Sequence, residues 1–170
     1  MAELTQTMER HAYSAEDRAG KYLTFRLANE EYGIEILHVQ EIIGMVPVTQ
    51  VPKTPEFVRG VINLRGKVIP IVDLRRKFGM ESMEDTEKTC IVVVQISSAS
   101  GNVTMGFIVD EVSEVLDIQA QEIEDAPSFG ASLDTAYILG MAKTKGSVKI
   151  LVDIDKVLAS EEIMQLEETA

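Results

Sequence analysis

The sequence predicts an all-β protein that contains two packed copies of one five-stranded barrel. The first observation is an internal repeat: residues 60–73 read GVINLRGKVIPIVD and residues 140–153 read GMAKTKGSVKILVD, so that two glycines, two valines and the closing aspartate align without a gap. A second pair of matching segments lies upstream, at residues 32–42 and 105–115. In addition, short apolar runs alternate with turn residues along both copies, which is typical of small β-barrels. A repeat of this length is too long for a solenoid and indicates an internal duplication.

The composition restricts the classes of protein to which the chain can belong. Among 170 residues the formal net charge is −12, which disfavours a nucleic-acid binder because phosphate contacts need clustered lysines and arginines. The same charge disfavours adhesion to an anionic membrane. No apolar run is long enough to cross a bilayer, and residues 1–20 lack the apolar core of a signal peptide. We therefore expect a soluble cytoplasmic protein that binds no nucleic acid and does not insert into a membrane.

The first barrel is predicted over about residues 21–80. Residues 1–20 show no sustained apolar stripe, so they are expected to form a mobile arm. Residues 21–27 alternate with period two. This pattern predicts a strand with Tyr22, Thr24 and Arg26 on one face and Leu23, Phe25 and Leu27 on the other. Two further strands are expected at residues 32–36 and 38–43.

Prolines and a glycine set the turns of the first copy. The prolines between residues 46 and 57 exclude a regular ladder strand, so this segment is expected to be a loop. Residues 58–64 and 67–72 are expected to form a hairpin, because Gly66 between them supplies the positive φ of a tight turn. Asp73 closes the second strand, and its carboxylate is expected to cap the short helical turn that follows.

An acidic linker at residues 78–89 leads into the second barrel, which is predicted over about residues 88–155. Its strands are expected at residues 90–96, 103–109, 112–118, 137–142 and 148–152. Asp153 repeats the capping position of the first copy, and Ser160 is expected to cap a C-terminal helix over about residues 160–168. The repeat does not decide whether the two copies exchange strands.

The reactive side chains needed for catalysis are scarce. The two histidines, His11 and His38, are distant in the sequence, and the single cysteine, Cys90, stands in an apolar run. These residues cannot complete a zinc site, and a thiol in apolar surroundings is not activated as a nucleophile. Asp73 and Asp153 are the best paired carboxylates, but their matching places in two copies favour helix caps over an acid–base pair. The sequence therefore predicts a binding module with no enzymatic activity, no cofactor and no metal.

Two segments carry a resemblance to a known family. Residues 59–74, RGVINLRGKVIPIVDL, closely resemble the signature of the CheW family of bacterial chemotaxis coupling proteins, and residues 31–42, EYGIEILHVQEI, look like its second motif. The resemblance extends over about residues 21–166. It implies a CheW-like domain over residues 21–170 that consists of two packed, five-stranded SH3-like barrels with short helices and a C-terminal helix.

The resemblance further implies what the protein does and which residues do it. Family members are non-enzymatic scaffolds that couple methyl-accepting chemoreceptor tips to the regulatory domain of the histidine kinase CheA. The chain is then expected in the cytoplasm, recruited to membrane-associated receptor arrays, with its receptor groove at the seam between the barrels. Transferred by position, the receptor contacts fall on Val39, Glu41, Gly60, Arg65, Val112 and Val115. The kinase contacts fall on Val48 and Phe129.

Other interpretations of these residues stay open from the sequence. Val39 can fill a barrel core, Arg65 can be a solvated turn residue, and Phe129 can plug the second barrel. Since side chains alternate along a strand, Val39 and Glu41 are expected to share one face, and a carboxylate seldom shares a core face, which favours a partly exposed edge. The alternative functions are a small-molecule-binding barrel and a regulatory fragment of a larger kinase or coupler.

Overall fold

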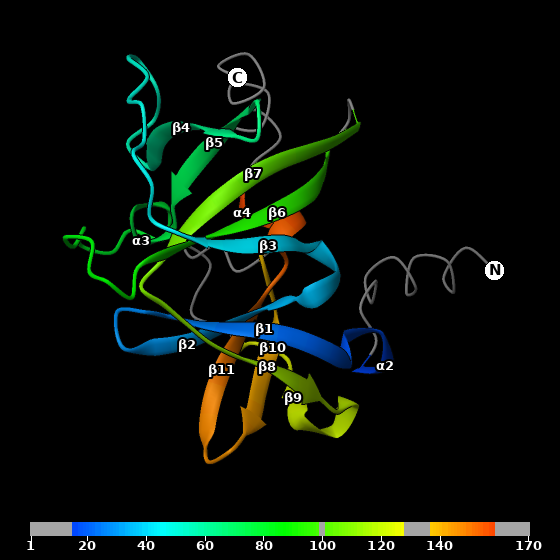
Figure 1. Cartoon of the computed structure of the whole chain (residues 1–170). Coiled ribbons are helices and arrows are strands. Elements are labelled where there is room, and N and C mark those ends of the chain that lie inside the picture. The colour runs from blue at the N-terminus through cyan, green and yellow to red at the C-terminus, as the bar shows by residue number, and fades with distance from the viewer. Residues whose placement is uncertain (1–14, 99–100, 128–136, 159–170) are drawn as a thin grey trace.

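The computed structural model describes residues 15–98, 101–127 and 137–158, and these form two β-sheets that lie one above the other in Figure 1. The first half of the chain supplies β1 (Gly20–Leu27), β2 (Glu30–Glu35), β3 (Val39–Gly44), β4 (Val58–Leu64) and β5 (Lys67–Asp73). The second half supplies β6 (Cys90–Ser98), β7 (Gly101–Val109), β8 (Glu111–Ile118), β9 (Ile123–Glu124), β10 (Ile138–Thr144) and β11 (Ser147–Val152). The helices are short: α2 (Ala15–Arg18), η1 (Ile36–His38), α3 (Leu74–Lys77), η2 (Ala120–Glu122) and α4 (Ile154–Val157). The all-β prediction is confirmed.

Each sheet takes strands from both halves of the chain. Sheet A has the order β8-β1-β2-β11-β10-β9, and sheet B has the order β3-β6-β7-β5-β4. The contiguous barrels predicted at about residues 21–80 and 88–155 are therefore wrong, because the hairpin β1–β2 joins strands of the second copy and the hairpin β6–β7 joins strands of the first. A sequence repeat shows how long one copy is. It does not show which strands pair, because strands of either copy can lie side by side in the folded chain.

Two parallel strand pairs hold this exchange in place. In sheet A, β2 runs parallel to β11, with Tyr32 opposite Ile150, and in sheet B, β5 runs parallel to β7, with Val72 opposite Phe107. Parallel neighbours cannot be joined by a tight turn and need a longer connection. The connection through η1 takes the chain from sheet A to sheet B, and the turn at Asp110 takes it back.

The two sheets share the same irregularity of strand register. The register of β3 against β6 shifts between Val39 and Glu41, and the register of β8 against β1 shifts between Val112 and Glu114. Such a shift is a β-bulge, in which one strand carries an extra residue. Since residues 112 and 114 follow residues 39 and 41 by the same 73 positions, the duplication extends to the details of the backbone.

The buried apolar side chains of the described residues form three hydrophobic clusters. The largest contains residues of both sheets, among them Phe25 and Phe107, and therefore lies between the sheets. Sheet A encloses a second cluster around Leu151, and sheet B encloses a third around Ile71. The strand predicted at residues 21–27 is confirmed as β1, which stands between two clusters, so that residues 22–25 at its centre are buried on both faces.

The caps predicted at Asp73 and Asp153 and the turn predicted at Gly66 are confirmed. The Asp73 carboxylate accepts a hydrogen bond from the backbone N–H of Arg75 at 3.1 Å, and the Asp153 carboxylate does the same for Asp155 at 3.1 Å. Each aspartate thus satisfies an N–H group that the first turn of a helix leaves without a partner. At the tip of the β4–β5 hairpin Gly66 has a φ of 87°, which suits glycine. Both aspartates therefore take the capping role that their matching positions predicted.

The N-terminal arm is shorter than predicted. Residues 15–20 were assigned to it, but α2 and the start of β1 occupy them, and Arg18 is buried. Its Nη1 donates to Asp125 at 2.8 Å and to the carbonyl oxygen of Leu139 at 3.0 Å, and the Tyr22 hydroxyl donates to its carbonyl oxygen at 2.6 Å. Residues 1–14 of the arm and the helix predicted at 160–168 lie outside the described residues.

One carboxylate joins both sheets at the turn between β7 and β8. Asp110 accepts a hydrogen bond from the backbone N–H of Ala28 at 2.9 Å, in the β1–β2 turn, and another from Nε of Arg75 at 2.7 Å, in α3. Burial alone would raise the pKa of Asp110, but the hydrogen bonds from Arg75 and Ala28 outweigh it and hold the pKa below its ordinary value. The ionised form is therefore the one that stabilises the fold.

We predict that Asp110→Asn lowers the free energy of unfolding at pH 7 by about 1–3 kcal/mol, because a charge-assisted contact between the sheets is lost. A carboxyl group whose pKa is depressed by folding contributes stability above its unfolded pKa, near 4, and loses it as the pH falls through the folded pKa. The difference between variant and wild type should therefore shrink below about pH 4 in urea titrations. The exposed Asp117→Asn serves as a control, and an equal effect there would contradict the assignment.

The strand exchange predicts that neither half of the chain folds alone. Fragments 1–85 and 86–170, which are cut in the connection between α3 and β6, each lack strands that complete both sheets. Each fragment should give the circular dichroism and amide spectrum of an unfolded chain, and mixing the two should restore the β-sheet signal. A folded, monomeric 1–85 fragment would show that the contiguous first barrel is stable after all.

Candidate interaction surface

The predicted receptor contacts on β3 and β8 lie at the rim of the central cluster. Val39 and Val112 are partly buried and pack against this cluster, whereas half of the Val115 side chain is exposed (50%). Val39 lies opposite Val94 and Val112 lies opposite Phe25, so both face the space between the sheets. The two edge strands therefore present equivalent apolar side chains at the margin of the same core.

The bulge in β3 changes the face on which Glu41 lies. Val39 lies opposite Val94, a member of the central cluster, but Glu41 lies opposite Val93, which belongs to the cluster inside sheet B. Residues opposite one another in a ladder point to the same side of the sheet. The expectation that Val39 and Glu41 share a face is therefore wrong, because the extra residue Gln40 interrupts the alternation.

Glu41 is instead paired with the tip of the neighbouring hairpin. Nη2 of Arg65 donates to Oε2 of Glu41 at 2.8 Å, and the Arg65 side chain is 70% exposed. The second barrel carries the same arrangement, in which Nζ of Lys145 donates to Oε1 of Glu114 at 2.6 Å. The duplication thus places one ion pair between edge strand and hairpin tip on each barrel, and the structure brings Glu41 and Arg65 together as one feature.

Sequence reasoning missed Ile42, which the structure places beside Val39. Ile42 lies opposite Val92 of the central cluster and is 43% exposed. It stands 73 positions before Val115, so it is the counterpart of that residue in the first copy. The repeat alignment therefore contained the signal, since it pairs Ile42 with a residue that was selected. Leu37, which is 91% exposed on η1, adds a further apolar side chain near β3.

Among the described residues, packed side chains fill the seam between the barrels. The central cluster occupies it with buried side chains from both sheets, including Leu23, Val94 and Phe107. A receptor side chain cannot enter without displacing this core, and removing one large core side chain typically costs about 2–5 kcal/mol. At the rim of this cluster, by contrast, Ile42 and Val115 are exposed.

The position assigned to Gly60 has a packing role. Its φ is 148°, and a Cβ atom added there would lie 2.1 Å from the carbonyl oxygen of Thr49. Thr49 and Val61 exchange two backbone hydrogen bonds of 2.9 Å, which fasten the segment after β3 to β4 and so close sheet B. A glycine at residue 60 lets the backbone of Thr49 approach this closely.

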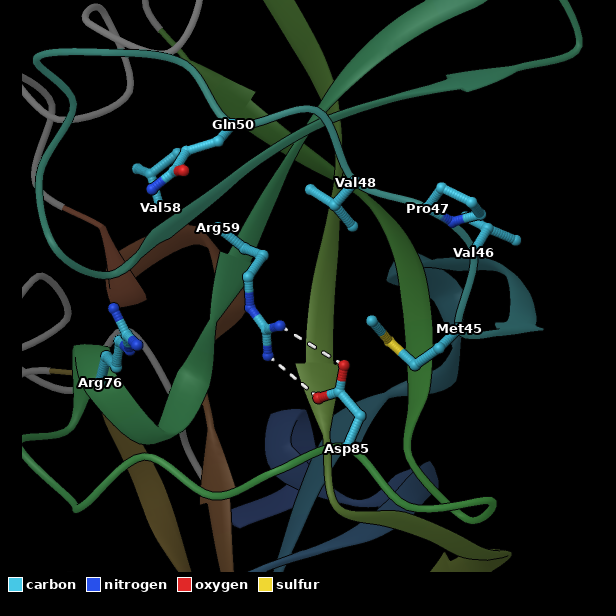
Figure 2. A pocket seen from close by; sticks show the side chains of 9 residues that line it. All are labelled: Met45, Val46, Pro47, Val48, Gln50, Val58, Arg59, Arg76 and Asp85. Carbon is cyan, nitrogen blue, oxygen red and sulfur yellow. Dashed lines mark hydrogen bonds and ion pairs between the residues drawn. The ribbon is translucent and has the colours of Figure 1, made fainter.

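Val48, the predicted kinase contact, lines a concave surface beside this closure. Figure 2 shows the groove with Arg59 at its centre, Val48 and Met45 along one side, and Asp85 facing the guanidinium. Its volume is about 420 Å³. We call it the Arg59 groove, and it is lined by Met45, Val46, Pro47, Val48, Gln50, Val58, Arg59, Arg76 and Asp85. The second predicted kinase contact, Phe129, lies outside the described residues.

The described residues offer little that resembles an active site. Cys90 is half-buried and packs against the central cluster, and burial raises the pKa of its thiol, as expected for a small apolar side chain. Within residues 15–98, 101–127 and 137–158 no group of three histidine, cysteine or acidic side chains could hold a metal ion. No helix in these ranges is long and apolar enough to cross a membrane.

Two interlocked small barrels with exposed apolar side chains on their edge strands define a protein-interaction module. Comparison with known proteins identifies which one: the model of the CheW-like domain matches residues 21–162, and the chain belongs to this family. The chemotaxis protein CheW of Klebsiella aerogenes is 43% identical over 150 residues, which is 88% of this chain and 88% of the relative. The CheW of Rhizobium meliloti is 36% identical over 140 residues, or 82% of this chain and 88% of the relative.

A solved structure supports the same assignment. The scaffolding protein TtCheW from Thermoanaerobacter tengcongensis superposes with a TM-score of 0.73 at 36% identity, over 85% of this chain and 97% of that chain. The two packed SH3-like barrels implied by the resemblance are thereby confirmed. The comparisons give no support to a small-molecule-binding barrel or to a regulatory fragment of a kinase.

We predict that Gly60→Ala destabilises the fold by about 2–4 kcal/mol. The new methyl group must push away the backbone of Thr49, and an alanine at residue 60 is strained at a φ of 148°. Gly44→Ala is the matched control, since a Cβ atom there meets nothing within 4 Å, and its effect should stay within about 0.5 kcal/mol. Thermal unfolding of both variants provides the measurement. If Gly60→Ala melts like wild type yet fails to bind a receptor, Gly60 is a contact residue and not a packing residue.

Proposed function

We propose that the protein is a non-enzymatic adaptor that couples methyl-accepting chemoreceptors to the histidine kinase CheA in chemotaxis signalling arrays. The observation that carries this proposal is the pair of exposed apolar side chains, Ile42 and Val115, on equivalent edge strands of a CheW-like fold. The chain would work in the cytoplasm and be recruited to membrane-associated arrays through its partners. Membership of the family of chemotaxis scaffolds supports this coupling role.

The receptor surface comprises the rim of the central cluster and the ion pair on β3. Along β3, Val39 and Ile42 lie opposite Val94 and Val92, so they are two ladder positions apart, or about 7 Å. This spacing suits one face of a helical receptor tip, whose apolar residues recur every three or four positions. Glu41 and Arg65 then offer a polar contact beside the apolar one, and their pairing contributes little to stability because Arg65 is exposed.

The kinase surface is proposed to lie elsewhere, at Val48 and Phe129. Val48 packs against the cluster inside sheet B and lines the Arg59 groove, whereas the apolar part of the receptor surface, at Val39, Ile42 and Val115, borders the cluster between the sheets. Two partners can then bind at the same time. A receptor could in this way shift the population of active kinase without any chemistry in the adaptor.

We predict that Val115→Glu weakens receptor binding at least tenfold, because a carboxylate must be desolvated at the rim. Val148→Glu is the control, since Val148 is 51% exposed and Val115 is 50% exposed. Both variants should keep the melting temperature of wild type, and both should bind the kinase normally. Titration calorimetry with a soluble receptor tip and with the kinase regulatory domain provides the readout.

Phe129→Ser and Val48→Glu should show the opposite pattern, with kinase binding weakened and receptor binding kept. Equal losses of receptor affinity in Val115→Glu and Val148→Glu would mean that general charge, and not a specific rim, governs the interaction. Loss of both partners in Val115→Glu alone would contradict two separable surfaces.

A further inference from the structure

The Arg59 groove contains a carboxylate that a partner could replace. We propose that this groove is a carboxylate-recognition site for the kinase, in which Asp85 occupies the place that an acidic side chain of the kinase takes in the complex. The inference rests on the proposed kinase-binding role, and it specifies the chemistry of the contact around Val48. The site would accept an aspartate or glutamate that is flanked by apolar residues.

Asp85 contacts Arg59 in the way that the carboxylate of a bound partner would. Nη2 of Arg59 donates to Oδ1 of Asp85 at 3.0 Å, and Nη1 donates to Oδ2 at 3.4 Å, so the guanidinium fork meets both carboxylate oxygens. Figure 2 shows the two groups facing each other across the groove. This bidentate geometry is the one by which arginine recognises carboxylates of binding partners. Within the described part of the chain the Nε of Arg59 is buried and has no hydrogen-bond acceptor.

The carboxylates of Asp73 and Asp85 lie near Arg59, and of these two only Asp85 could be displaced from the guanidinium by a partner. Asp73 is buried and caps α3, so its position is fixed by the fold, and its Oδ2 lies 3.7 Å from Arg59 and 3.8 Å from Arg76. Asp85 lies in the connection between α3 and β6, outside any helix or strand, and its side chain is 34% exposed. Breaking an exposed ion pair costs about 0.2–1 kcal/mol, so a partner's carboxylate can take its place.

An apolar wall stands beside the guanidinium. Met45, Val46, Pro47 and Val48 form it, and Val46 is 40% exposed. Two further depressions of about 550 Å³ and 440 Å³ share Arg76 with the groove and continue it along Glu56. A second guanidinium and an adjoining hollow thus extend the site beyond one side chain, which suits a short segment of a protein partner better than a small carboxylate.

The kinase is the occupant that these observations favour. The predicted kinase contact Val48 belongs to the apolar wall. A second copy of this chain is disfavoured, because two molecules that each carry a formal charge of −12 repel one another. The exchange of Asp85 for a kinase carboxylate keeps Arg59 paired in both states, so no charge is left without a partner in the groove.

The test measures binding of the kinase regulatory domain to four variants of the full chain by titration calorimetry. Asp85→Asn should tighten binding about two- to fivefold, because the internal competitor is removed. Glu87→Gln removes the same charge from the same connection and should change nothing. Arg59→Gln should weaken binding about tenfold or more, and in the double variant Asp85→Asn should no longer tighten it. Melting temperatures and retained receptor binding check that each variant is folded.

The possible outcomes separate the two proposals. If wild type does not bind the kinase, the proposed function fails, and the groove proposal fails with it. If wild type binds but Arg59→Gln binds equally well, only the groove proposal fails. Weaker binding by Asp85→Asn, or equal tightening by Glu87→Gln, would also overturn it, because Asp85 would then be a contact or a general charge. Self-association of Asp85→Asn in sedimentation would identify a second copy as the occupant and reject the kinase.

Discussion

The parallel pairing of each hairpin with the other copy is the constraint on which the structure depends. Because β2 pairs with β11 and β5 pairs with β7, each sheet is completed only by strands from both halves of the chain. The hairpins then stand between two clusters, and the largest core forms between the sheets. This arrangement leaves β3 and β8 as edges at the rim of that core, and it brings the apolar side chains there to the surface.

The internal repeat and the family resemblance predicted the fold class, and the further details that could be predicted from the residues were local. The capping role of Asp73 and the hairpin glycine Gly66 involve residues two or three positions apart, so short patterns specify them. The exchange of strands depends on contacts across the whole chain, and no local pattern distinguishes it from two contiguous barrels. The bulge at Gln40 likewise leaves no local sign, and for this reason Glu41 was placed on the wrong face. The family resemblance selected Val115 but not its counterpart Ile42, although the repeat pairs them.

The two proposed surfaces use polar groups in a similar way. On β3 the partner of Glu41 is an exposed arginine, and in the Arg59 groove the partner of Arg59 is an aspartate whose side chain is about one-third exposed. Exposed ion pairs add little to the stability of the fold, so their members can change partners at small cost. An adaptor that must bind and release without chemistry benefits from charges of this kind, whereas the carboxylates of Asp73 and Asp110, which are more buried, are committed to the fold.

The crossing of the chain at η1 and at Asp110 has a mechanical consequence. Two barrels joined by one linker could pivot about it, and a displacement at one barrel would then be absorbed at the joint. Here the chain crosses between the two sheets twice, and the central cluster packs between them, so a pivot would have to strain both crossings and disturb this core. The two barrels should therefore move as one body, and under the proposed function a displacement of the rim at Val115 in sheet A would be carried to the groove at Val48 beside sheet B.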